Sequence, residues 1–370
     1  MGRRLTVVQL LPALDAGGVE RSTLEIAAAL VDAGHRAIVV SAGGRMVPQL
    51  EAIGAEHVGL DIGRKSPACL RHVPALRRLF VRERVDIVHA RSRLPAWLAR
   101  LALASIAYGH RPHFVTTVHG LNSPSRYSAV MLSGERVICV SRTVREYVLR
   151  HYPATDPGRL QVIERGIDPA AFPRAPLPDV DARKAVAAWD PALGGDGPLL
   201  LLPGRGTRLK GHVDGLRLLA ALRRDGSDAR LWMPGARQAG RQAYVVELER
   251  HARDLGVADA VAMTEPTAAI VQAYAASDLV LQLSHKPEAF GRTVLEALAV
   301  GRPVLGWAHG GVGELLQQWW PAGAVVPFDE PALAHAAAAL LARPPPLPGT
   351  MPDGLRAMQQ ATLALYEQLA

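Results

Sequence analysis

The stretch from residue 278 to residue 306 constrains the fold most, because it has the pattern of one complete strand, helix and strand. The apolar run DLVLQL at 278–283 is typical of a buried strand, and residues 293–300 are rich in helix formers. The tripeptide GRP at 301–303 supplies a glycine C-cap and a proline that ends the helix. A strand, a helix and a second strand in this order predict a parallel pair whose sheet is covered on both faces.

The same alternation recurs from the beginning of the chain and restarts near residue 199, so the sequence predicts an α/β protein with two sheets. A chain of 370 residues is long for one hydrophobic core and suits two domains. A segment rich in Pro, Ala and Gly between the two halves predicts an interdomain linker. The predicted division is an N-terminal α/β domain at 1–170, a linker region at 171–198, a C-terminal α/β domain at 199–350, and a helix at 351–370 that packs back on the N-terminal domain.

Two glutamates flank the start of the helix predicted at 293–300. Glu288 is expected in the preceding loop and Glu296 in the helix, where both can face one cleft at the helix N-terminus. Backbone N–H groups from Phe290 to Thr293 would point at the same cleft and bind hydroxyls or phosphate oxygens. Glu296 has a second interpretation, since Thr293 and Glu296 have the T-x-x-E spacing of a capping box.

Three further loops follow predicted strands and carry polar residues. Arg205 and Lys210 offer a guanidinium fork and an ammonium, which suit a diphosphate. Their loop has neither the phosphate-binding Walker spacing nor the dinucleotide G-x-G-x-x-G spacing. Gly17-Gly18 lets a ligand approach a helix N-terminus, or is a plain tight turn. His119 ends the strand HFVTTV and is either a site residue or an ordinary loop histidine.

The segment RKSPACLRHVPALRRLFVRER at 64–84 is strongly basic, and the chain has a net charge of +8. This balance favours an anionic partner: nucleic acid, acidic lipid or a phosphorylated substrate. Apolar residues at helical spacing, Leu70 among them, would leave the arginines exposed. The arginine face is either simply solvated or contacts an anionic lipid or acceptor. The candidate acceptor or membrane residues are Arg71, Arg77, Arg78, Arg91 and Arg93.

Cys69 and Cys139 have no metal or redox spacing, which fits a reducing cytoplasm. No apolar run approaches the roughly 20 residues that span a bilayer. The apolar start of the chain is better explained by a strand leading into a glycine turn than by a signal peptide. Asp179 and Asp181 form a D-x-D pattern, but their proline-rich setting with no preceding strand indicates coincidence rather than a metal site.

Several motifs, in order, resemble the retaining GT-B glycosyltransferases of family 4. The run from Glu288 to Val304 is similar to the paired-glutamate signature of that family. VHARSRLPAW at 88–97 and the following TTVHG look more specifically like bacterial lipopolysaccharide-core glycosyltransferases. The accompanying motifs are GGVER at 17–21, TVHG at 117–120, RGIDPAAF at 165–172, GRGTRLKG at 204–211 and GGVGE at 310–314.

The resemblance implies a GT-B fold, in which two Rossmann-like domains face a central cleft. It implies a retaining hexosyltransferase that uses a nucleotide sugar, with GDP-mannose as the first expectation and a UDP-hexose as the next. The implied acceptor is a lipopolysaccharide-core or related glycolipid. The enzyme would be cytoplasmic and peripheral to the anionic inner leaflet, and would need neither a metal nor a further cofactor. Nucleic acid is not an expected partner.

The resemblance also implies roles for residues. Arg205 and Lys210 would neutralise the donor diphosphate, and Glu288 would hold sugar hydroxyls together with the amides of Phe290 and Gly291. Glu296 would bind the ribose. His119 would lie near the transferred sugar. The expected catalytic residues are His119, Arg205, Lys210 and Glu288, and the expected donor-binding residues also include Gly17, Gly18, Phe290, Gly291, Arg292, Thr293 and Glu296.

Arg165 departs from the family pattern, in which many members have Asn before Gly-Ile-Asp, and its role stays open. Two rival functions also stay open. The chain could be another GT-B enzyme, such as a nucleotide-sugar epimerase or a sucrose-type synthase, or a non-catalytic subunit that binds nucleotide sugars. A free epimerised sugar nucleotide or a soluble disaccharide product would distinguish the first two. An oxidoreductase is disfavoured because the dinucleotide turn is missing.

Overall fold

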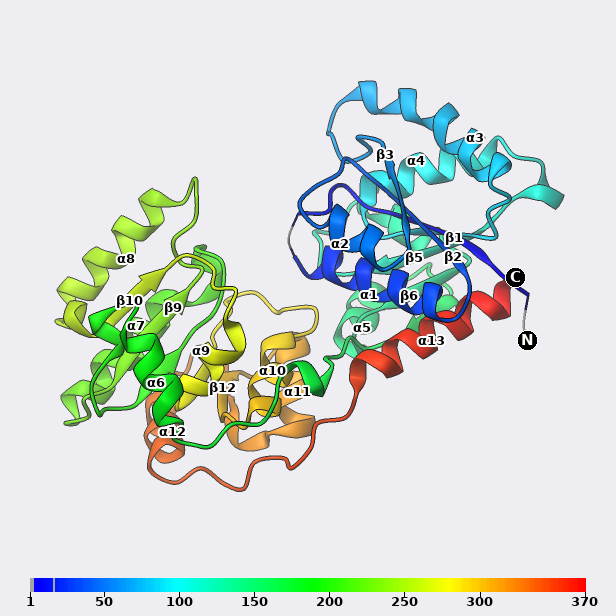
Figure 1. Cartoon of the computed structure of the whole chain (residues 1–370). Coiled ribbons are helices and arrows are strands. Elements are labelled where there is room, and N and C mark those ends of the chain that lie inside the picture. The colour runs from blue at the N-terminus through cyan, green and yellow to red at the C-terminus, as the bar shows by residue number, and fades with distance from the viewer. Residues whose placement is uncertain (1–2, 16) are drawn as a thin grey trace. The chain divides into compact units, whose positions relative to one another are not determined.

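The computed structural model describes residues 3–15 and 17–370 of the chain (Figure 1). It divides into two compact units, each built around its own parallel sheet. The first unit comprises Met1–Arg165 and Gly354–Ala370, and the second comprises Gly166–Asp353.

The first unit contains a sheet of seven parallel strands in the order β3-β2-β1-β4-β5-β6-β7. Central strand β4 is buried at every position, as expected for a parallel sheet with both faces covered. The strands are β1 (Thr6–Leu10), β2 (Arg36–Ser41), β3 (Glu56–Gly59), β4 (Ile87–Ala90), β5 (His113–Val118), β6 (Arg136–Cys139) and β7 (Leu160–Val162). The α-helices are α1 (Gly18–Asp32), α2 (Val47–Ala52), α3 (Val73–Arg82), α4 (Arg93–Ala104), α5 (Arg142–His151) and α13 (Gly354–Leu369).

The second unit contains six parallel strands in the order β10-β9-β8-β11-β12-β13. Each sheet therefore has one point where the strand order reverses, between β1 and β4 and between β8 and β11. The strands are β8 (Leu199–Leu201), β9 (Arg230–Pro234), β10 (Val261–Thr264), β11 (Leu279–Gln282), β12 (Val304–Trp307) and β13 (Ala324–Val325). The α-helices are α6 (Val180–Ala187), α7 (His212–Arg224), α8 (Gln242–Asp254), α9 (Ile270–Ala276), α10 (Arg292–Val300), α11 (Gly310–Trp319) and α12 (Glu330–Ala342).

The C-terminal helix α13 belongs to the first unit although it follows the whole second unit in sequence. Met358, Leu365 and Tyr366 join the first hydrophobic core, and α13 contacts α1. The Tyr366 hydroxyl lies 2.6 Å from Nδ1 of His89 in β4. An apolar stripe and one buried hydrogen bond thus hold this helix against the first sheet.

The segment predicted as an interdomain linker, 171–198, is instead part of the second unit. Phe172, Val186 and Leu193 are buried in the second core. Asp179 accepts a hydrogen bond from the Ala182 backbone N–H and so caps α6. The composition of the segment suggested a connection, but its few apolar residues have the spacing needed to pack on the second sheet.

Candidate functional site

The reversal point of the second sheet gathers the polar residues that follow β8 and β11. Ligands of open α/β sheets bind at such points, outside the carboxyl ends of the strands. Lys210 Nζ lies 2.6 Å from Glu288 Oε1, and the Ser284 hydroxyl also donates to Glu288. Burial disfavours the ionised form of Glu288, but Lys210 and Ser284 outweigh that effect and lower the pKa of Glu288 below its ordinary value. At neutral pH Glu288 is therefore a carboxylate, and it lies next to the Lys210 amino group.

Two glycines hold the loops after β8 and β11 close to the rest of the second unit. Gly211 has a φ of +71°, and a Cβ there would collide with the Leu283 carbonyl oxygen. Gly291 has a φ of +113° and precedes α10, and a Cβ there would lie 2.8 Å from a methyl group of Val312. These glycines bring Lys210 and the N-terminus of α10 to the same edge of the sheet.

Arg205 is exposed beside this cluster. No hydrogen bond or ion pair of its guanidinium is found among residues 3–15 and 17–370, while its positive charge contributes to lowering the pKa of Glu288. Three kinds of donor could bind a phosphate oxygen here: the Arg205 guanidinium, the Lys210 amino group and the first N–H groups of α10. Phe290 is buried, and Arg292 and Thr293 form the first turn of α10.

Glu296 lies in the middle of α10, so the capping-box interpretation is wrong. The N-cap is Gly291, which places Thr293 inside the helix rather than at its start. Glu296 is buried, accepts a hydrogen bond of 2.8 Å from the Tyr274 hydroxyl, and pairs with Arg292 at 3.3 Å. The structure thus gives Glu296 protein partners, and its predicted contact with a ribose remains a prediction.

The reversal point of the first sheet places Gly18, Arg91 and His119 near one another, around a small cavity that Arg91, His119 and Arg165 all line. Arg165 donates to the Gly18 carbonyl at 2.6 Å and to His119 Nδ1. Because a guanidinium only donates, His119 Nδ1 must accept, and the ring proton is on Nε2. His119 Nε2 is buried and has no hydrogen-bond partner among the described residues. This N–H is a donor available to a ligand.

Arg91 does not lie on the surface that was predicted to face an acceptor or membrane. Its side chain is buried, bonds to Gln9 Oε1 at 2.7 Å and donates to Ser22. Burial lowers the pKa of Arg91 to about 10, so the group stays charged at neutral pH. The pattern VHARSR suggested a loop residue because it ends a strand. In fact Arg91 turns into a polar layer that sequence reasoning missed, which also contains His89, Thr117 and Tyr366.

The remaining predicted basic residues are at the surface. Arg71, Arg77 and Arg78 are exposed on the 3-10 helix η1 (Pro67–His72) and on α3. Arg93 is half-buried and lies over the ring of Tyr127 at 5.4 Å. Leu70 was expected on the buried side but is 52% exposed, because the helix predicted through it is a 3-10 turn at that point, with a different periodicity.

Comparison with known proteins identifies the family of the chain. Residues 16–171 match the model of Glycosyltransferase Family 4, and residues 186–351 match that of Glycosyl transferases group 1. The chain belongs to this glycosyltransferase family. The crystal structure of a glycosyltransferase from Rickettsia africae ESF-5 superposes on it with a TM-score of 0.83, at 27% identity, covering 99% of this chain and 98% of that one. The fold is accordingly GT-B, with two Rossmann-like domains.

The chain is also similar to two other proteins. A D-inositol 3-phosphate glycosyltransferase from Xylanimonas cellulosilytica is 33% identical over 218 residues, which is 58% of this chain and 49% of that protein. The chain thus spans about half the length of this curated relative. WaaG, a glycosyltransferase involved in lipopolysaccharide biosynthesis, has a TM-score of 0.67 at 18% identity, covering 98% of this chain and 93% of that one, and so shares the fold.

The arrangement around His119 predicts a change in its pKa when Arg165 is replaced. Burial, and then the charges of Arg165, Arg91 and His89, hold the pKa of His119 well below its ordinary value. Arg165→Gln removes one of these charges, so we expect the pKa of His119 to rise, as measured by NMR titration of the imidazole protons. Arg165→Lys keeps the charge and serves as the control. An unchanged titration in Arg165→Gln would contradict the contact.

Proposed function

We propose that this protein transfers a hexosyl group from a nucleotide sugar to an acceptor that carries an anionic group, with retention at the anomeric carbon. The acceptor we propose is a lipopolysaccharide-core or related surface glycolipid. The observation that carries the proposal is the cluster of Lys210, Glu288 and Arg205 at the reversal point of the second sheet. Two cations suit a diphosphate, and a fixed carboxylate suits sugar hydroxyls.

The chemistry of the leaving group explains the cations. As the bond from the anomeric carbon to the diphosphate oxygen breaks, negative charge grows on the diphosphate. Arg205 and Lys210 would stabilise that charge more in the transition state than in the ground state, which accelerates the reaction. Glu288 would accept hydrogen bonds from sugar hydroxyls. The backbone N–H groups at the start of α10 would donate hydrogen bonds to sugar hydroxyl oxygens. On the first unit, His119 Nε2–H would donate to the transferred sugar, and Gly17-Gly18 would lie near the phosphates.

The test of this function is calorimetric binding of GDP-, UDP-, ADP- and dTDP-hexoses in the presence of EDTA. We expect one nucleotide family to bind, with GDP-mannose and UDP-hexoses as first candidates, and Arg205→Ala to weaken that binding at least tenfold. Arg241→Ala, which removes an exposed arginine before α8, serves as the control. Absence of binding to all four families, or binding that requires a divalent metal, would contradict the proposal.

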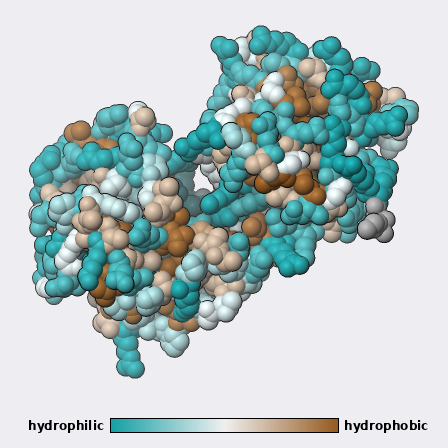
Figure 2. Space-filling model, in the orientation of Figure 1, coloured by the Kyte–Doolittle hydropathy of each residue, from teal (hydrophilic) through white to brown (hydrophobic). Residues whose placement is uncertain are grey.

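We further propose that the first unit associates with the surface of an anionic membrane, where a glycolipid acceptor is found. The arginines of η1 and α3 stand next to exposed apolar side chains, Leu70 and Val81. Figure 2 displays apolar residues among hydrophilic ones over the unit that contains α3 and α4. Within the described residues, none of the helices has the length and apolar character to cross a bilayer. Cationic and apolar side chains together suit peripheral binding to anionic lipid.

Charge reversal on α3 tests this surface. Arg77→Glu with Arg78→Glu should weaken binding to vesicles of anionic phospholipid by at least tenfold, at about 1 kcal/mol per arginine, and leave donor affinity unchanged. The matched control is Arg250→Glu with Arg253→Glu on α8, which changes the net charge equally at exposed positions of the second unit. Equal losses of vesicle affinity in both double variants would show that net charge alone controls binding, and would contradict the proposal that η1 and α3 form the binding surface.

A further inference from the structure

Phe328, between β13 and α12, has a backbone conformation that bulky residues rarely adopt. Its φ is +68°, in the left-handed region, and its side chain is 53% exposed. Strained positions of this kind persist where the surroundings fix them, and they concentrate at functional sites. Neither the strain nor the exposure of an aromatic ring favours folding, so a role in binding would account for both.

Two imidazoles stand nearly perpendicular to the Phe328 ring. The His285 ring centroid lies 5.5 Å away at an interplanar angle of 83°, and that of His309 lies 5.9 Å away at 86°. The ring centroid of the buried Trp307 lies 5.9 Å from that of Phe328. This arrangement makes an exposed aromatic surface bordered by polar ring nitrogens.

Hydrogen bonds connect this surface with the glutamate of the proposed donor site. His309 Nε2 lies 2.8 Å from the Ser284 carbonyl, and the Ser284 hydroxyl donates to Glu288. His285 follows Ser284 directly, and its Nε2 lies 2.6 Å from Asp214 Oδ2. The aromatic surface and Glu288 are thus held by the same short loop.

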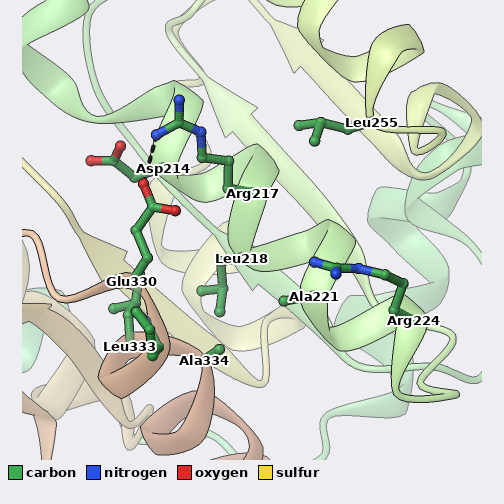
Figure 3. Close-up of a pocket in the computed structure, with 10 residues that line it drawn as sticks. Asp214, Arg217, Leu218, Ala221, Arg224, Leu255, Glu330, Leu333 and Ala334 are labelled. Carbon is green, nitrogen blue, oxygen red and sulfur yellow. Dashed lines mark hydrogen bonds and ion pairs between the residues drawn. The ribbon is translucent and has the colours of Figure 1, made fainter.

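Asp214 links the surface to a groove between α7 and α12. It lines a pocket of about 300 Å³ and lies beside the ion pair of Arg217 and Glu330, whose Nη1 and Oε1 are 2.6 Å apart (Figure 3). The carboxylate of Asp214 is largely buried, whereas His285 is 42% exposed. Hydrogen-bonding groups therefore extend from His285, beside Phe328, to Asp214 in α7.

The nucleotide end of the proposed donor site lies on the other face of the sheet. Connections from β8 to β9 and from β11 to β12 run in opposite directions across the sheet, so right-handed crossovers place α7 and α10 on opposite faces. Glu296, the predicted ribose ligand, is in α10 and bonds to Tyr274 of α9. Asp214 is in α7 and Phe328 shortly precedes α12, and these two helices contact each other. A ring stacked on Phe328 is accordingly not expected to be the nucleobase.

We propose that Phe328, His285 and Asp214 form a subsite for a saccharide ring next to Glu288. A pyranose offers an apolar C–H face to an aromatic ring, while its hydroxyls donate to a carboxylate and pair with imidazole nitrogens. The choice of a saccharide rests on the proposed function, since an enzyme that transfers a hexose onto a glycan must hold sugar rings other than the donor's. The subsite would fix the orientation of that ring relative to the anomeric carbon.

The experiment measures saccharide binding directly, by saturation-transfer NMR with methyl α-D-glucoside, methyl α-D-mannoside and maltose, with and without UDP or GDP. We expect Phe328→Gly to weaken saccharide binding roughly fivefold and Phe328→Trp to retain it. Glycine accepts a φ of +68°, so relief of strain should offset the lost packing on Trp307 and keep the unfolding temperature near that of wild type. If Phe328→Gly is unstable, Phe328→Asn, which also tolerates this conformation, replaces it.

Val326→Ala is the matched control, because Val326 is 67% exposed in the same segment but has no aromatic ring. Saccharide binding that is equal in wild type and Phe328→Gly, or absent from wild type, would overturn the inference. So would an equal loss in Val326→Ala, or a loss confined to UDP or GDP affinity, which would assign the ring to the nucleobase. Donor calorimetry on wild type is read separately, so failure of the proposed function and failure of this subsite give different results.

Discussion

Replacing Lys210 with methionine should lower kcat by about 10²–10³-fold, the usual cost of removing one preorganised group that stabilises transition-state charge. Methionine keeps most of the aliphatic stem and removes the ammonium that lies 2.6 Å from Glu288. The loss should appear in kcat more than in KM, because the charge on the leaving diphosphate grows mainly in the transition state. Single-turnover transfer from the donor found by calorimetry would measure it.

The control for Lys210 comes from the same short 3-10 helix, η7 (Arg208–Lys210). Arg208 is exposed and pairs with Glu247, away from Glu288. Arg208→Ala should change kcat by less than about threefold, in keeping with the small effect of surface ion pairs. If Lys210→Met retained more than a fifth of wild-type kcat, Lys210 would only be a structural partner of Glu288.

Replacing Arg302 with methionine should destabilise the second unit by about 3–5 kcal/mol, because several buried carbonyls lose their donor and each unsatisfied group costs about 1–3 kcal/mol. Arg302 is fully buried in a loop between α10 and β12. Its guanidinium donates to backbone carbonyls from three segments. The closest are Pro176 and Ala275, both at 2.6 Å, followed by Tyr274 at 3.1 Å and Ala175 and Gly301 at 3.2 Å.

Urea unfolding of the whole chain would measure this effect. With two compact units, we expect more than one transition, and only that of the second unit should move to lower urea. Arg302→Lys should recover only part of the stability, since an ammonium cannot reach so many carbonyls at once. Arg343→Met, at an exposed position, should change stability by no more than about 0.5 kcal/mol. A change below about 1 kcal/mol in Arg302→Met would contradict the assignment.

The local patterns of the chain predicted the local structure well. The strand and helix between residues 278 and 300 are present as β11 and α10, and Gly301 ends α10 with a φ of +85°. The hydrophobic pattern and the glycine cap act within a few residues, so they can be recognised without knowledge of the fold. Strand ends then located Lys210 and Glu288 at one sheet edge, because parallel strands end together.

Contacts between distant segments required the tertiary structure. Arg302 looked like part of a helix-ending turn, yet its partners at 175 and 176 lie more than a hundred residues earlier. Arg91 looked like an exposed loop residue, but it bonds to Gln9 and Ser22 inside the first unit. Arg165, whose role was open, orients His119. Periodicity and capping are local, so residue patterns could predict two parallel sheets with alternating helices and the loops that carry the polar residues. Residue patterns could not predict which arginines are buried and which are exposed, because burial depends on segments that meet only in the folded chain.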